Sequence, residues 1–204
     1  MPISDILSKA AKLTVVATLR DPMVAKIDFL LGPWAVAPRL FNDVAAAVAA
    51  GNVEVVYNSA VAGKAYYYHE TDQIELGFMT TSEATKRALI IHECVHAGFD
   101  LKWHSAMDIA TSEAAGYLAQ CIFARAYSTA PDDPDYRLYN DDPDKDAVFI
   151  VGWRLAGKVL ASEKLTNDDH RALSEAVLKH PDYEHGRDIA AWDGVKGYWY
   201  RTRR

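Results

Sequence analysis

Cysteine is scarce in this chain, with two residues in 204. Two cysteines cannot build the disulfide framework that stabilises many small secreted domains. Cys94 and Cys121 both lie within largely apolar segments. We therefore expect both to be small core side chains rather than metal ligands.

Long hydrophobic runs are also missing. The longest apolar stretch near the N-terminus, residues 29–38, is interrupted by glycine and proline and is too short to span a bilayer. The first residues include an early acid, Asp5, and lack the basic stretch that opens a secretion signal. The sequence predicts no membrane partner and favours a cytoplasmic protein, while export by a route without an N-terminal signal stays open.

Basic residues are fewer than acidic ones: the chain has 22 Lys and Arg and 28 Asp and Glu, which gives a net charge of −6. Affinity for nucleic acids rests on clustered Lys and Arg, and the short basic tail at 201–204 does not supply such a cluster. We therefore expect no nucleic-acid partner. Half of the residues are apolar, which is enough for a hydrophobic core.

One short stretch stands out among the residues that are present: His92-Glu93-Cys94-Val95-His96, which reads H-E-x-x-H. Side chains four residues apart lie above one another on a helix, so two imidazoles at this spacing can bind one metal ion. Glu93 follows the first histidine. Its carboxylate can reach a water molecule held on the same metal, which is the general-base position of a metallohydrolase.

A helix with two surface histidines is the alternative interpretation of this pattern. The preceding residues 88–91 are apolar, so the helix is expected to be buried, where an unpartnered histidine pair would be unfavourable. Upstream, Thr80 and Glu83 fit a capping box with Thr80 as N-cap, which predicts a helix that starts there. The context therefore favours a metal site.

Glu113 is the main candidate for a third ligand, since a catalytic zinc site usually has three protein ligands and one open position. Polar residues after Asp100 indicate that the first helix ends nearby, and the apolar residues of 112–127 keep helical spacing. The chain between His96 and Glu113 leaves room for a short loop and a second helix that returns to the metal. His104 is the rival third ligand.

An H-E-x-x-H helix followed by a Ser-Glu-Ala-Ala helix resembles the gluzincin-type zincin metallopeptidases, over roughly residues 66–127. The resemblance implies a zinc-dependent hydrolase that cleaves peptide (amide) bonds in a peptide or protein substrate. It implies His92, His96 and Glu113 as zinc ligands and Glu93 as general base. Glu93 would take a proton from the zinc-bound water as that water attacks a carbonyl carbon, and deliver it to the leaving nitrogen.

The chain departs from this family at one position. Many gluzincins place an aspartate four residues after the glutamate ligand, where it supports a histidine, and Tyr117 stands there in this chain. A ligating imidazole normally donates its second N–H to an oxygen. Tyr117, Asp100 and Asp108 are the candidates for that oxygen.

Three strands are expected before the motif. Residues 53–57 form one, and 65–69 with 74–78 form a β-hairpin around polar turn residues. By the family resemblance, the edge strand beside the H-E-x-x-H helix pairs with substrate, and 74–78 is our candidate; an ordinary covered strand is the alternative. The fold class is thus α+β and zincin-like, predominantly helical with a small antiparallel or mixed sheet before the H-E-x-x-H helix.

The length fits a single zincin-like domain spanning 1–204. The acidic, proline-rich stretch at 130–145 is expected to be a solvated connector. A capping box at Thr166 and Asp169 predicts a helix that runs to residue 179. The expected parts are a helical N-terminal part at 1–52, the sheet and metal-binding helices at 53–128, and C-terminal helices with a tail at 146–204.

Peptide hydrolysis on zinc also needs a donor that stabilises the developing oxyanion. Tyr183 and His185 follow the last expected helix and are our candidates, with His170 and Tyr136 as rivals.

Two other functional classes compete with a general peptidase. One is a zincin-fold effector or partner-binding module with narrow or no general peptidase activity. The other is a structural zinc site, which would need a fourth ligand and usually cysteine. The sequence carries no signal for the oligomeric state.

Overall fold

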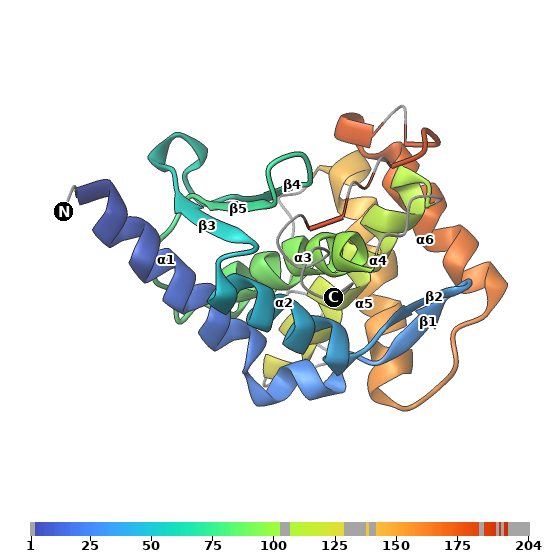
Figure 1. Cartoon of the computed structure of the whole chain (residues 1–204). Coiled ribbons are helices and arrows are strands. Elements are labelled where there is room, and N and C mark those ends of the chain that lie inside the picture. Colours follow the sequence, from blue (N-terminus) through green and yellow to red (C-terminus); the bar gives the residue numbers. More distant parts are fainter. Residues whose placement is uncertain are drawn as a thin grey trace.

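The computed structural model describes residues 3–102, 107–128, 138, 142–183, 186–190, 192, 194 and 195. Within these residues the protein is mixed α+β, mostly helical, with two small sheets, which confirms the predicted class at that level. Figure 1 shows helices α3 and α4 at the centre, with the sheet β3-β5-β4 against α3 and with α5 and α6 against α4. None of the described helices is long and apolar enough to cross a membrane.

Six helices and three 3₁₀ turns are described. The helices are α1 (Ile3–Leu19), α2 (Pro38–Ala50), α3 (Ala84–Leu101), α4 (Ile109–Tyr127), α5 (Pro143–Leu160) and α6 (Asn167–Lys179). The 3₁₀ turns are η1 (Pro22–Lys26), η2 (Ser59–Val61) and η3 (Pro181–Tyr183). The strands are β1 (Phe29–Leu31), β2 (Trp34–Val36), β3 (Glu54–Tyr57), β4 (Ala65–Tyr68) and β5 (Gln73–Leu76).

Helix α3 carries the H-E-x-x-H motif through the middle of the molecule and is buried over most of its length. A side chain at Gly98 would place its Cβ 2.3 Å from Leu40 of α2, so the glycine permits close packing of the two helices. The predicted start of this helix is wrong. Its N-cap is Glu83 without a side-chain cap, and Thr81 Oγ1 instead accepts a hydrogen bond from Glu83 N over 3.0 Å.

The strand next to α3 differs from the predicted one. In the three-stranded sheet β5 is central, parallel to β3 and antiparallel to β4. The 74–78 segment, predicted as the edge strand, is therefore an interior strand, because β3 pairs with its other side. Strand β4 is the edge that contacts α3. Periodicity alone predicts that a segment is a strand, but it does not predict the order of strands in a sheet.

The N-terminal part contains a hairpin that the sequence did not predict. Strands β1 and β2 pair antiparallel around Gly32, which has a positive φ of 60°. Each strand has three residues, too few for an alternating pattern to be recognised among helical segments.

The C-terminal helices follow the prediction closely. Thr166 and Asp169 form the predicted capping box of α6. Helix α5 starts at Pro143 with Asp142 as N-cap, so it extends into the predicted connector at 130–145. Apart from Leu138, the rest of that connector lies outside the described residues.

Candidate metal centre

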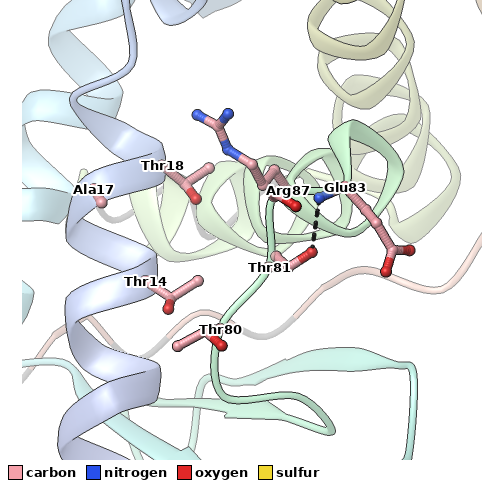
Figure 2. Close-up of a pocket in the computed structure, with 8 residues that line it drawn as sticks. Thr14, Ala17, Thr18, Thr80, Thr81, Glu83 and Arg87 are labelled. Atoms are coloured by element: carbon pink, nitrogen blue, oxygen red, sulfur yellow. Dashed lines mark hydrogen bonds between the residues drawn. The ribbon is translucent and has the colours of Figure 1, made fainter.

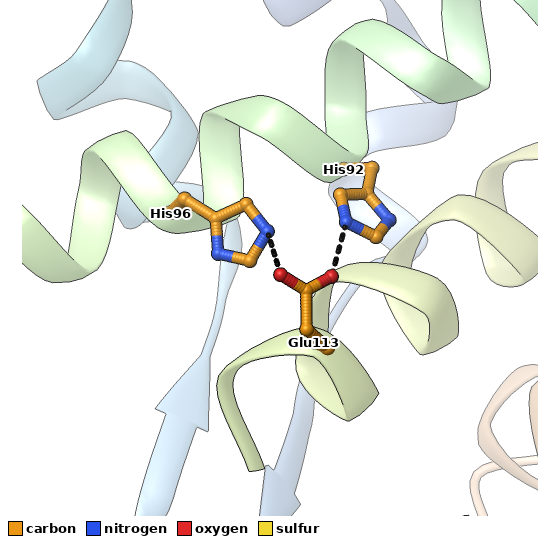
Figure 3. A group of neighbouring side chains, drawn as sticks. All are labelled: His92, His96 and Glu113. Atoms are coloured by element: carbon orange, nitrogen blue, oxygen red, sulfur yellow. Dashed lines mark hydrogen bonds and ion pairs between the residues drawn. The ribbon is translucent and has the colours of Figure 1, made fainter. Parts of the chain in front are cut away.

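The three predicted ligands meet at one point. His92 and His96 project from one face of α3, and Glu113 reaches them from the second turn of α4 (Figure 3). Glu113 Oε2 lies 3.1 Å from His92 Nε2, and Glu113 Oε1 lies 3.6 Å from His96 Nε2. One potential ligand atom from each residue falls within 4.8 Å of the others. The structure therefore contains a His-His-Glu group close enough to bind one metal ion.

The packing of α4 on α3 creates this convergence. Asp108 is the N-cap of α4 and accepts a hydrogen bond from Thr111 N over 2.7 Å, which starts the helix just before Glu113. One turn later stands Gly116. A Cβ there would lie 2.9 Å from both Cε1 and Nε2 of His92, so only glycine leaves room for the imidazole.

The second ring nitrogen of each histidine is bonded to a side chain of α4. His92 Nδ1 lies 3.1 Å from Gln120 Oε1, and His96 Nδ1 lies 3.0 Å from Ser112 Oγ. Because the Gln120 oxygen can only accept, His92 Nδ1 donates to it, which in the neutral ring leaves the lone pair of Nε2 for a metal. These contacts turn both Nε2 atoms toward Glu113.

The oxygens that the sequence suggested for this task are used elsewhere. Asp108 caps α4, and Asp100 accepts a hydrogen bond from the hydroxyl of Tyr67 over 2.5 Å. Tyr117 meets His92 in an edge-to-face ring contact, with 4.6 Å between ring centroids and 83° between ring planes. That set of candidates was wrong because Gln120, two turns after Glu113, has the better approach to the imidazole.

The residues present fit a divalent transition-metal ion. In a tetrahedral site with metal–ligand bonds of about 2.0–2.1 Å, neighbouring ligand atoms lie about 3.3 Å apart. The distances from the Glu113 oxygens to the Nε2 atoms of His92 and His96, 3.1 Å and 3.6 Å, are close to this value. Among the described residues this group has three members. Three ligands leave a position for a water molecule or substrate, as in catalytic rather than structural sites.

The pKa values of the two glutamates in this site, Glu113 and Glu93, are shifted in opposite directions. Burial raises the pKa of Glu113, but the charges and hydrogen bonds of His96 and His92 outweigh it and bring that pKa well below its usual value. Burial raises the pKa of Glu93 to about 7, helped by the charge of Glu113 and opposed by His92 and the N–H of Tyr67. Glu113 is therefore ionised, as a metal-binding carboxylate has to be, while Glu93 can exchange a proton near neutral pH.

A cavity of about 760 Å³ opens onto these residues. The two histidines, Glu113 and Glu93 line it. Strand β4 forms one wall, and α5 with η3 forms another. Seven aromatic side chains also line it: Tyr66, Tyr67, Tyr68, Tyr117, Phe149, Tyr183 and Trp192.

Tyr183, predicted as an oxyanion donor, does line this cavity. Its hydroxyl lies 3.5 Å from that of Tyr117. Burial raises the pKa of Tyr183, and the charge of Glu113 raises it further, so the phenol keeps its proton. The rival donor His170 is not brought to the site: its Nε2 lies 3.4 Å from Thr111 Oγ1, and it lines a different pocket.

Three predicted candidates fall in segments that are not described. These are His185, Tyr136 and the rival ligand His104.

His180 is a cavity residue that the sequence analysis did not identify. It is 8% exposed, and its ring centroid lies 5.2 Å from that of Tyr183. Its Nδ1 accepts a hydrogen bond from Asp182 N over 3.3 Å, so in the neutral ring the proton is on Nε2. Its sequence signal is the His-Pro pair at 180–181, which is typical of a helix end.

A second pocket, of about 460 Å³, lies between α1 and the start of α3 (Figure 2). Its wall is rich in hydroxyl groups, from Thr14, Thr18, Thr80, Thr81 and Ser82. Arg87 also lines it, but its guanidinium is bonded to Asp21. The described part of this pocket holds no group of three metal-binding side chains.

No protein-family description, curated protein or solved structure matches this chain.

Proposed function

We propose that this protein is a zinc-dependent metallopeptidase with a zincin-like fold, which hydrolyses peptide (amide) bonds. The position of Glu93 carries the proposal. Its carboxylate lines the same cavity as the His-His-Glu group, directly after one ligand in the chain, and the N–H of Tyr67 holds it over 2.8 Å. Two imidazoles and one carboxylate are a common ligand set of catalytic zinc.

Each residue has a defined task in this reaction. When bound, zinc would polarise the scissile carbonyl and lower the pKa of a water molecule that it holds. Glu93 accepts the proton of the attacking water and passes it to the leaving nitrogen. Tyr183 and His180 offer an O–H and an N–H in the same cavity, where they can stabilise negative charge on the carbonyl oxygen.

Strand β4 supplies the surface for an extended substrate. The N–H of Tyr67 points away from β5 toward Glu93, and in an antiparallel ladder the C=O of the same residue faces the same side. Strand β4 is therefore the sheet edge beside the cavity, where an extended peptide can add as a further strand. This assigns to β4 the role that the sequence analysis gave to residues 74–78.

Three variants test the proposal in one experiment. Wild type, Glu93→Gln, Glu113→Ala and the exposed control Glu175→Gln are loaded with zinc, and both bound zinc and cleavage of denatured protein and peptide libraries are measured. We expect about one zinc per chain in all but Glu113→Ala, and at least ~100-fold slower cleavage in Glu93→Gln.

Two results would refute the assignment. Full activity in Glu93→Gln would show that Glu93 is not the general base. A wild type that binds zinc but cleaves none of these substrates would overturn the general peptidase and favour the dedicated effector or partner-binding module.

A further inference from the structure

The segment 186–190 runs against the start of α4 (Figure 1). Gly186 O accepts a hydrogen bond from Ala110 N over 2.6 Å, and Asp188 O accepts one from Ile109 N over 3.0 Å. In return, Ala190 N donates to Met107 O over 2.9 Å. The first amides of a helix have no partner within the helix, so this segment completes the hydrogen bonding of α4 directly before Glu113.

Farther along the chain, Trp192 covers one of the metal ligands. Its indole is stacked on His96, with 6.1 Å between centroids and 24° between planes. It also meets the edge of His69, 5.7 Å away. The indole therefore lies as an apolar ring beside His96, where it limits the access of water to a bound metal ion.

The position of the indole does not depend on a hydrogen bond to any described residue. Its Nε1 is buried and has no hydrogen-bond partner within the described part of the chain. A buried indole N–H usually finds an acceptor, so a neighbouring contact has to fix the ring instead.

Asp100 provides that contact. It lies one helical turn after His96 and is completely buried. One carboxylate oxygen accepts a hydrogen bond from Gly194 N over 2.7 Å, two residues beyond Trp192, and the other accepts one from Tyr67 OH over 2.5 Å. A buried carboxylate is unfavourable without such donors, so both bonds are strongly maintained.

We propose that Asp100 is a positioning residue that holds the C-terminal segment against α3, so that Trp192 covers His96 and slows the loss of the metal ion. The inference rests on the metal centre of the proposed function but not on peptide hydrolysis. It assigns a function to a buried acid that neither binds the metal nor takes part in proton transfer.

The rate of zinc transfer from the loaded full-length chain to an excess of a coloured chelator tests this inference. Asp100→Asn keeps the shape of the side chain but has one accepting oxygen in place of two. We expect Asp100→Asn and Trp192→Ala each to speed zinc loss by ~10-fold or more. The double variant should be no faster than the faster single variant, because both act through one contact. Trp34→Ala in β2 is the control and should keep the wild-type rate.

A spectroscopic measurement separates positioning from general loosening of the fold. Co²⁺ bound at the site should quench the emission of the nearby Trp192. This quenching should shrink in Asp100→Asn and in Trp192→Ala but persist in Trp34→Ala. Thermal unfolding of each metal-free variant shows whether the fold is retained.

Several outcomes would overturn the inference: a wild-type rate in Trp192→Ala, additive effects in the double variant, or unchanged quenching in Asp100→Asn. A wild type that binds no zinc would overturn both this inference and the proposed function. If the rates change as expected but no peptide is cleaved, the positioning role of Asp100 is supported and the proposed peptidase activity is refuted.

Discussion

The backbone N–H of Tyr67 lies 2.8 Å from Oε2 of Glu93 and donates a hydrogen bond to it. The hydroxyl of the same tyrosine donates to Asp100, so one residue of β4 is bonded to α3 on both sides of His96. The edge strand therefore orients the carboxylate that we assign as general base. A shift of β4 along α3 would therefore move both the strand edge that we propose binds the substrate and the carboxylate of Glu93.

Gly116 gives a direct test of how tightly the metal centre is packed. The added methyl of Gly116→Ala would lie 2.9 Å from the His92 ring, so the imidazole has to turn away from Glu113. We expect zinc affinity to fall at least ~10-fold, as for other changes that misorient a ligand. Competition with a chelator of known affinity measures it.

Gly157→Ala is the matched control for that variant. It also adds a methyl within a helix, but the nearest atom, 2.8 Å away, belongs to the flexible guanidinium of Arg125, which can move. Wild-type zinc affinity in Gly116→Ala would show that the imidazole is not confined as the structure indicates.

The bond between Gln120 and His92 predicts a second effect on the metal. Gln120→Leu keeps much of the volume but removes the oxygen that accepts from Nδ1. We expect zinc affinity to drop by ~10- to 100-fold, because the imidazole loses its orientation and some of its basicity. Isothermal titration with zinc measures this. If Gln120→Leu binds zinc as wild type does, the contact does not orient His92.

The positions of the candidate ligands could be predicted from the sequence because two of them share one helix turn and a short connection limits where the third can lie. His92 and His96 are one turn apart on α3, and Glu113 lies near the start of the next helix, which the packing of α4 on α3 brings back to them. The supporting contacts depend instead on how helices and strands pack. The sequence analysis did not identify Gln120 as the partner of His92, and no pattern in the sequence marks a backbone contact such as that of Tyr67.

Tyr183 tests the oxyanion assignment. Tyr183→Phe removes one hydroxyl and keeps the ring that packs beside Tyr117 and His180. If this hydroxyl stabilises the transition state, kcat should fall by ~10²-fold with little change in KM. Steady-state kinetics on a cleavable peptide separate the two parameters. An equal rise in KM with constant kcat would instead make Tyr183 a substrate-binding residue.

A second buried network makes stability depend on pH independently of the metal. Asp21 accepts hydrogen bonds from Arg87 and Tyr127, which joins η1 to α3 and α4. Burial raises the pKa of Asp21, but its bonds to Tyr127, Met23 and Arg87 outweigh burial and lower the pKa below 3.8. A carboxyl whose pKa is lower in the folded state stabilises the fold above its unfolded pKa, and this stabilisation disappears as pH falls through the folded value.

Asp21→Asn should therefore be less stable than wild type by about 2 kcal/mol at neutral pH, a typical effect of breaking a partly buried network. The gap should stay constant down to about pH 4 and close below it, because wild type then loses the charge that the variant never had. Urea unfolding of the metal-free proteins over this pH range measures the gap. Asp43→Asn is the control, since its surface pair with Arg39 spans 3.9 Å and should be worth less than about 1 kcal/mol. A gap that is independent of pH would mean that Asp21 contributes through packing rather than through its charge.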